Sequence, residues 1–408
     1  MPRLLLLIPT TTYRTADFME AAGKLGVEIV VASDRPNVLE GEFPENLLTL
    51  DFSDPGKAAR AVAELARRTP IDAVVPVDDL TTVVGAAVAH ALGLRGSPVG
   101  AVATTRNKHA MREALRRAGI PSPPYRLLTL RDDPAAASRQ AYPCVLKPTV
   151  LAASRGVIRA NDPAEFVAAF RRIEAILSTP EVAALGEGAD QILVEGFIPG
   201  REVALEGLLI GGELAVLALF DKPDPLDGPF FEETIYVTPS RLPTGTQAAI
   251  REAAARAARA LGLTEGPVHV ELRVNDAGPW LLELAARSIG GLCSRTLRFG
   301  TGMSLEEIIL CHALGSTIAS LERERRPAGV MMLPIPREGV LEAVRGQAAA
   351  EAVPGIEAVT ISAHLGQELV PLPEGSRYLG FVFARAETPA DVEDALRIAH
   401  AQLRFDVA

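Results

Sequence analysis

The sequence of 408 residues lacks any apolar run that approaches the ~20 residues needed to cross a bilayer. The run Leu4–Ile8 is also too short for a secretory signal, and Pro9 ends it. The composition, 48% hydrophobic and 23% charged residues, is that of an ordinary folded protein. We therefore expect a cytoplasmic protein with no membrane partner.

Cysteine is scarce. The three present, Cys144, Cys293 and Cys311, lie far apart and form no CxxC pair. An odd number without close spacing fits neither a disulfide framework nor a zinc site. We expect three small core residues in a reducing compartment.

Positive charge is also in short supply, since 41 Lys and Arg face 51 Asp and Glu for a net charge of -10. This balance opposes attraction to phosphate backbones, so we expect no nucleic-acid partner. Lysine is especially rare: the five lysines are Lys24, Lys57, Lys108, Lys147 and Lys222. A lysine kept in such an arginine-rich chain suggests a site that cannot fit a guanidinium, although chance retention on the surface is expected for the first two.

The first hundred residues alternate short apolar runs with helical patterns. This βαβαβ rhythm predicts a parallel sheet with helices on its faces and ligands at the carboxyl ends of its strands. The loop over residues 9–13 lacks the glycines of a GxGxxG fingerprint, which disfavours an NAD-binding domain. Asp78 and Asp79 directly follow the third predicted strand, residues 71–77. We expect their carboxylates to be solvated, and a contact with a ligand is the alternative.

The sequence pattern changes from about Asn107. A helix is predicted over 108–118, and it ends before a proline-rich segment. Two hairpins follow, the first dividing at Gly211-Gly212 and the second spanning 268–284. The remaining segment predicts a small α+β closing domain. We expect a multidomain chain of α/β and α+β type, divided into a parallel α/β domain at 1–106, a central region at 107–326 and the closing domain at 327–408.

The second hairpin places two carboxylates together. If Asp276-Ala277-Gly278 is a three-residue loop, Glu271 lies directly opposite Glu283. Like charges about 5 Å apart repel, so a sheet tolerates the pair mainly where a cation or a shared proton lies between them. Mg²⁺ suits the position, since it binds one or two carboxylates and completes its shell with substrate phosphates. A register shifted by one, with one glutamate facing solvent, is an equal alternative.

Groups suited to phosphate follow the hairpin. Arg287 shares the face of Glu283 if the strand continues, and a guanidinium fits a pair of phosphoryl oxygens. Gly290 and Gly291 come next and permit close approach of the backbone to a ligand. His269 shares the face of Glu271, where we expect a supporting hydrogen bond because Mg²⁺ prefers oxygen ligands.

A second candidate lies earlier in the chain. Lys147 ends an apolar strand and precedes a loop of small residues that holds Ser154. A point charge beside such a loop suits nucleotide phosphates, although this loop is not a P-loop. Paired carboxylates also occur in glycosidases, but the neighbouring cations favour phosphate chemistry.

Taken in order, these segments resemble the ATP-grasp enzymes, and most of all the L-amino acid ligase branch of the carboxylate-amine ligases. The resemblance covers nearly the whole chain, and its strength lies in order and spacing. It rests on Asn107-Lys108, Gly119–Pro121, Tyr142–Pro148, Ser154–Val157, Val194–Glu202 and Glu283–Arg287.

The resemblance implies ATP and Mg²⁺ as cofactors, with Mn²⁺ as a substitute. It assigns Lys108 and Lys147 to the ATP phosphates and the loop around Ser154 to closure over them. It makes residues 195–198, including Glu195, Phe197 and Ile198, the hinge that contacts adenine, largely through the backbone, and Glu202 the acceptor of the ribose hydroxyls. It gives Glu271 and Glu283 to the metal and Arg287 to the transferred phosphoryl group. Ala285 stands where many members have an asparagine ligand, which puts a second metal in doubt.

The implied reaction joins a small-molecule carboxylate to an amine. The carboxylate attacks the γ-phosphate to give an acyl phosphate and ADP, and the amine then displaces phosphate. In similar enzymes the stretch with Lys222 and residues 230–233 lies near the acceptor, where Glu232 or Glu233 would receive an ammonium; a mobile loop is the alternative. Other hypotheses are a carboxylase, a purine-type ligase or a noncatalytic ATP-binding regulator. A homodimer is compatible with the sequence.

Overall fold

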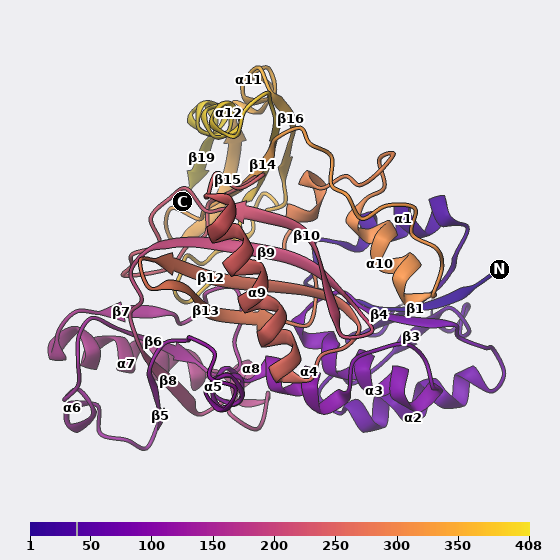
Figure 1. Cartoon of the computed structure of the whole chain (residues 1–408), viewed down its shortest axis with the longest axis horizontal. Coiled ribbons are helices and arrows are strands. Elements are labelled where there is room, and N and C mark those ends of the chain that lie inside the picture. Colours follow the sequence, from indigo (N-terminus) through magenta and orange to yellow (C-terminus); the bar gives the residue numbers. More distant parts are fainter. Residues whose placement is uncertain (38–39) are drawn as a thin grey trace.

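The predicted parallel sheet is present at the N-terminus of the computed structural model, which describes residues 1–37 and 40–408 (Figure 1). Its strand order is β3-β2-β1-β4, and all pairs are parallel. Leu4–Leu7 are completely buried, as expected of a strand covered on both faces. The short strand β3 (Leu47–Thr49) was not predicted. The elements are β1 (Arg3–Leu7), α1 (Thr15–Leu25), β2 (Glu28–Ser33), β3 (Leu47–Thr49), α2 (Pro55–Ala66), β4 (Ala73–Pro76), the 3-10 helix η1 (Asp79–Thr81) and α3 (Thr82–Leu92).

Two helices lead to a small antiparallel sheet of order β5-β8-β6-β7, which we call the small lobe. Helix α7 begins after Asp162, whose carboxylate accepts from the backbone N–H groups of Ala164 and Glu165. Its apolar face, with Phe166 and Phe170, covers the lobe. The elements are α4 (Val99–Arg106), α5 (Lys108–Arg117), β5 (Tyr125–Thr129), α6 (Pro134–Ala137), β6 (Cys144–Pro148), β7 (Ile158–Ala160), α7 (Pro163–Leu177), α8 (Pro180–Ala183) and β8 (Gln191–Gly196).

A second sheet of eight strands, in the order β13-β12-β9-β10-β11-β14-β18-β16, forms the centre of the molecule. Its first five strands come from the central region: β9 (Arg201–Ile210), β10 (Glu213–Asp221), β11 (Ile235–Thr238), β12 (Gly266–Asn275) and β13 (Gly278–Ala285). The other three come from the segment expected to form a closing domain: β14 (Ala328–Leu333), β16 (Ile356–Ile361) and β18 (Gly380–Arg385). That segment therefore shares its main sheet with the central region.

The remaining elements belong to the end of the central region and to the C-terminal part. In the C-terminal part a three-stranded sheet of order β17-β15-β19 shares an apolar cluster with α11 and α12. The remaining elements are η2 (Cys293–Thr296), α10 (Leu305–Ala313), β15 (Gly339–Arg345), α11 (Gln347–Glu351), β17 (Glu368–Leu369), α12 (Pro389–Gln402) and β19 (Arg404–Val407). None of the helices in the described residues has the length and apolarity that a bilayer crossing requires.

Helix α9 (Thr244–Leu261) lies across one face of the large sheet (Figure 1). Val203, Leu205, Val268 and Val270 pack with its buried side, which includes Ile250. Because side chains alternate along a strand, the residues between these point to the opposite face. They are Glu202 and Ala204 on β9, and His269 and Glu271 on β12.

The hairpin of β12 and β13 confirms the predicted pairing by a different route. Asn275 pairs with Gly278, so the loop has two residues and the expected three-residue loop is wrong. The register shifts between Leu272 and Glu271, and because of this shift Glu271 pairs with Glu283 as predicted. The irregularity offsets the shorter loop, and both glutamates lie on the face away from α9.

We predict that Ile250→Ala lowers the free energy of unfolding by about 2–5 kcal/mol, because it leaves a cavity between α9 and the sheet. Ile398→Ala is the matched control, since Ile250 is 0% exposed and Ile398 is 52% exposed. Urea unfolding followed by circular dichroism measures both. Equal losses would contradict the assignment of α9 to the core.

Candidate active site

Three carboxylates gather around one ammonium group on the face of the sheet away from α9. Oxygens of Glu202, Glu233 and Glu271 lie within 4.8 Å of one another. Lys222 Nζ is 2.9 Å from Glu202 Oε1 and 3.5 Å from Glu271 Oε1, and it also contacts Glu233. Burial lowers the pKa of Lys222, but the three carboxylates outweigh it and raise that pKa. The lysine therefore stays charged and balances part of this acidic cluster.

The two predicted metal ligands have different lysine partners. Glu283 Oε1 lies 3.2 Å from Lys108 Nζ, whereas Glu271 faces Lys222. Lys108 also donates to the carbonyl of Leu151, at 2.6 Å, in the loop between β6 and β7. The atoms on this face that could bind a metal are carboxylate oxygens, the ligand type that Mg²⁺ prefers, so the residues fit that ion.

Lys147 belongs to a buried ionic triad. Its Nζ is 2.8 Å from Glu195 Oε2, and Arg112 Nε is 2.6 Å from Glu195 Oε1. Burial lowers the pKa of Lys147, while Glu195 acts in the opposite direction. The side chain of Glu195 thus holds Lys147 in place, which leaves only its backbone for the expected adenine contact. Nothing in the sequence of α5 marked Arg112 as the third member.

The predicted hinge is held by arginines. The ring of Phe197 has the guanidinium carbons of Arg159 at 4.2 Å and Arg273 at 4.8 Å from its centroid. Arg273 NH1 donates to the Ile198 carbonyl at 2.9 Å, and its Nε donates to Glu202 at 3.0 Å. Glu202 is thus shared by Arg273 and Lys222. Sequence reasoning missed Arg273, although it lies two residues beyond Glu271 on the same strand face.

Arg287 is anchored by the N-terminal domain. Its Nε and NH2 both lie 2.8 Å from Asp79 Oδ2, and Arg106 NH1 lies 3.1 Å from Asp79 Oδ1. Burial raises the pKa of Asp79, but the two arginines outweigh it and hold that pKa well below its usual range. The expectation of a solvated carboxylate at Asp79 is therefore wrong. Its burial depends on a partner more than 200 residues away, which local sequence does not reveal.

His269 has the supporting position expected of it. Its Nδ1 lies 3.1 Å from Glu206 Oε2 and its Nε2 lies 3.6 Å from Glu271 Oε1. Burial opposes protonation, yet the hydrogen bond with Glu206 and the nearby Glu271 carboxylate raise the pKa of His269 to about 9. Glu206 also accepts from the backbone N–H of Ile289 at 3.0 Å. The position of Glu206 inside an apolar strand was the sequence signal that could have revealed its contact with His269.

The loop after β13 is fixed from two directions. Arg14, from the loop after β1, donates to Ser288 Oγ at 2.6 Å and to the Ile289 carbonyl at 3.2 Å. Gly291 has a φ of 59°, and a Cβ there would lie 2.8 Å from Phe381 on β18. Packing against the C-terminal strands alone therefore accounts for this glycine, while a Cβ on Gly290 would meet nothing within 4 Å.

Two predicted residues stand apart from these contacts. Glu232 has no ion-pair or hydrogen-bond partner in the part of the chain that the structure describes, and burial raises its pKa. Ser154 lies in the loop between β6 and β7 with a φ of 55°. Both residues are half-buried.

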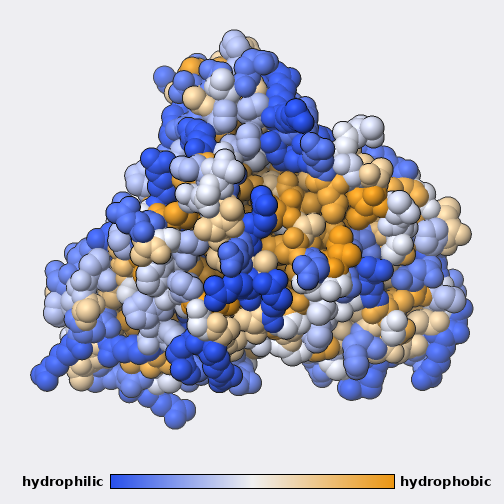
Figure 2. Space-filling view, in the orientation of Figure 1, coloured by the Kyte–Doolittle hydropathy of each residue, from blue (hydrophilic) through white to orange (hydrophobic). Residues whose placement is uncertain are grey.

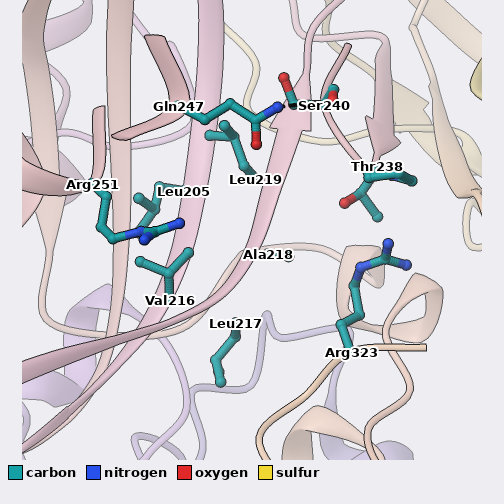
Figure 3. Close-up of a pocket in the computed structure, with 11 residues that line it drawn as sticks. Leu205, Val216, Leu217, Ala218, Leu219, Thr238, Ser240, Gln247, Arg251 and Arg323 are labelled. Carbon is teal, nitrogen blue, oxygen red and sulfur yellow. Dashed lines mark hydrogen bonds between the residues drawn. The ribbon is translucent and has the colours of Figure 1, made fainter. Parts of the chain in front are cut away.

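A separate hollow of about 180 Å³ lies on the α9 side of the sheet (Figure 3). Leu205 and Val216 form part of its floor, and Arg251 and Arg323 extend toward it from opposite sides. Figure 2, which views the same face, shows apolar side chains gathered beside the β9–β10 hairpin. Because Leu205 points away from the carboxylate face, this hollow is not part of the candidate active site.

Three known domain families match the chain. An ATP-grasp N-terminal domain matches residues 19–96, an ATP-grasp domain matches 140–296, and L-amino acid ligase C-terminal domain 2 matches 331–408. The central match contains the two predicted metal ligands, Glu271 and Glu283, and also Lys147 and Arg287.

Curated relatives and solved structures agree with these matches. Alanine–anticapsin ligase of Bacillus subtilis (strain 168) is 27% identical over 325 residues, which cover 75% of this chain and 68% of that protein. Carnosine synthase 1 of Gallus gallus is 29% identical over 352 residues, which cover 80% of this chain and 38% of that protein. The L-amino acid ligase from Bacillus licheniformis has a TM-score of 0.81 at 26% identity, covering 100% of this chain and 99% of that one. The chain is thus an ATP-grasp protein of the carboxylate-amine ligase type that resembles the L-amino acid ligases.

Proposed function

We propose that this enzyme uses ATP to activate the carboxylate of one amino acid and joins it to the amine of a second, giving a dipeptide-like amide, ADP and phosphate. The convergence of two lysines, Arg287 and the paired glutamates on one sheet face supports phosphoryl transfer to a carboxylate. Similarity to carnosine synthase 1 of Gallus gallus and to dapdiamide A synthase of Enterobacter agglomerans supports a dipeptide-like amide as the product.

In this mechanism the substrate carboxylate attacks the γ-phosphate, and the bond to the β-phosphate oxygen breaks to release ADP. Lys108, Lys147 and Arg287 would stabilise the charge that spreads over the phosphoryl oxygens. Glu271 and Glu283 would hold Mg²⁺, which would neutralise triphosphate charge when bound. The amine then attacks the acyl carbon and displaces phosphate. Water must stay outside, because it would hydrolyse the acyl phosphate.

The acidic groups beside the acceptor stretch suit an ammonium. Glu232 has no partner among the described residues and Glu233 contacts only Lys222 among the cations, so a second amino acid would find an unsatisfied carboxylate there. We assign Glu232 to this role. A cytoplasmic location fits the three buried, unpaired cysteines.

The substrate class is tested by phosphate release with Mg²⁺, ATP and a panel of L-amino acid pairs. We expect release that depends on a particular pair, with one amide detected by mass spectrometry for each phosphate. Stimulation by bicarbonate alone would instead indicate a carboxylase. Nucleotide binding without release for any pair would indicate a regulatory protein.

We predict that Arg287→Ala lowers turnover by about 10²–10³, as expected when one donor to developing charge is removed. Binding of ADP, measured by calorimetry, should persist because the nucleotide keeps its two lysines. Arg325→Ala is the control, since this arginine is 95% exposed. Unchanged turnover in Arg287→Ala would remove this residue from the phosphoryl site.

We predict that Glu283→Gln raises the Mg²⁺ concentration needed for half-maximal rate by about tenfold or more, because it removes one anionic ligand. The rate at saturating ATP is followed as Mg²⁺ is varied. Glu368→Gln, at an exposed position of β17, is the control. An unchanged Mg²⁺ requirement would place the ion elsewhere.

A further inference from the structure

The loop between β6 and β7 has an unusual backbone. Ala153 and Ser154 have φ values of 53° and 55°, a region that L residues seldom occupy. Such a conformation persists only where surrounding contacts hold it. Two of these contacts come from the C-terminal part of the chain. Gly156 N–H donates to the Pro373 carbonyl at 2.9 Å, and Arg155 Nε donates to the Glu374 carbonyl at 2.9 Å.

Glu374 also binds the small lobe through its side chain. Arg172 of α7 donates to both of its carboxylate oxygens, with Nε 2.5 Å from Oε1 and NH2 2.8 Å from Oε2. The same guanidinium lies over the ring of Phe230, 4.9 Å from its centroid. We call these four residues, Arg155, Arg172, Phe230 and Glu374, the clasp.

Phe230 extends the clasp to the acceptor stretch. It forms a β-bridge with Ile158 on β7, and the neighbouring Pro229 carbonyl accepts from Arg159 N–H at 2.9 Å. Glu232 lies two residues further along. One residue of the C-terminal segment, Glu374, therefore holds the loop expected to cover the triphosphate through its backbone carbonyl. Through its carboxylate and Arg172 it reaches the stretch expected to receive the amine.

We infer that Glu374 is a positioning residue for the ligation reaction, which holds the phosphate-covering loop and the acceptor stretch closed together while the acyl phosphate exists. This inference rests on the proposed function. The side chains of Arg172 and Glu374 are 44% and 39% exposed, so their ion pair is weak enough to open in each cycle. The bidentate geometry supplies direction that a single contact would lack.

The chemistry provides a sensitive readout of closure. When the amine attacks the acyl carbon, a C–N bond forms, the C–O bond to phosphate breaks and amide and phosphate appear in equal amounts. When water attacks the acyl carbon instead, the same C–O bond breaks, the original acid is regenerated, phosphate is released and no amide forms. The ratio of phosphate to amide therefore measures how often the site opens too early.

The test is Glu374→Gln in the full chain, with the substrate pair that the panel identifies. We expect the phosphate-to-amide ratio to rise about two- to fivefold, the size expected for one partly exposed ion pair. The matched control is Asp406→Asn, which breaks an exposed ion pair with Arg345, 2.9 Å long, elsewhere in the C-terminal part. Arg172→Glu combined with Glu374→Arg should bring the ratio back toward that of the parent. An unchanged ratio in Glu374→Gln would overturn the inference.

A second measurement does not depend on ligation. Trypsin cleaves after arginine, and Arg155 lies in the held loop. We expect cleavage after Arg155 to be about two- to fivefold faster in Glu374→Gln than in Asp406→Asn, with and without a nonhydrolysable ATP analogue. Equal cleavage rates would overturn the clasp even if ligation is confirmed, whereas faster cleavage without any amide product would retain the clasp and contradict the proposed function.

Discussion

Charge balance on one face of the large sheet is the constraint on which the rest of the site depends. Carboxylates on neighbouring strands repel one another, and burial increases the cost. The chain offsets this with a cation for each group: Lys222 for the cluster around Glu271, Lys108 for Glu283, and Arg273 for Glu202. Each of these carboxylates therefore has a cationic partner within the fold.

The cations come from segments that lie far apart in the sequence. Lys108 begins α5, Lys222 follows β10, and Arg287 is fixed by Asp79 from the N-terminal domain. The sheet supplies Glu202, Glu271 and Glu283, and the lysines lie just outside its strands. Assembly of the site therefore requires the N-terminal domain to pack against the central region.

This origin explains what could be predicted from sequence. The pairing of Glu271 with Glu283 was predicted from a three-residue loop, but the loop has two residues and a register shift restores the pairing. The rarity of lysine marked Lys108 and Lys147. The shift in register after Glu271 was not visible, since a bulge depends on packing across the sheet. The contacts of Arg112 and Asp79 were missed for a related reason: each partner lies far away in sequence, and neither arginine nor aspartate is unusual in its local setting.

The pairing of Asp79 with Arg287 bears on how such enzymes can be recombined. A hybrid that takes its first domain from one parent and its central region from another exchanges one half of this partly buried ion pair. An incoming domain without an acid at the same point would leave Arg287 without this partner. Swaps confined to the outer C-terminal strands β15, β17 and β19 leave this pair intact.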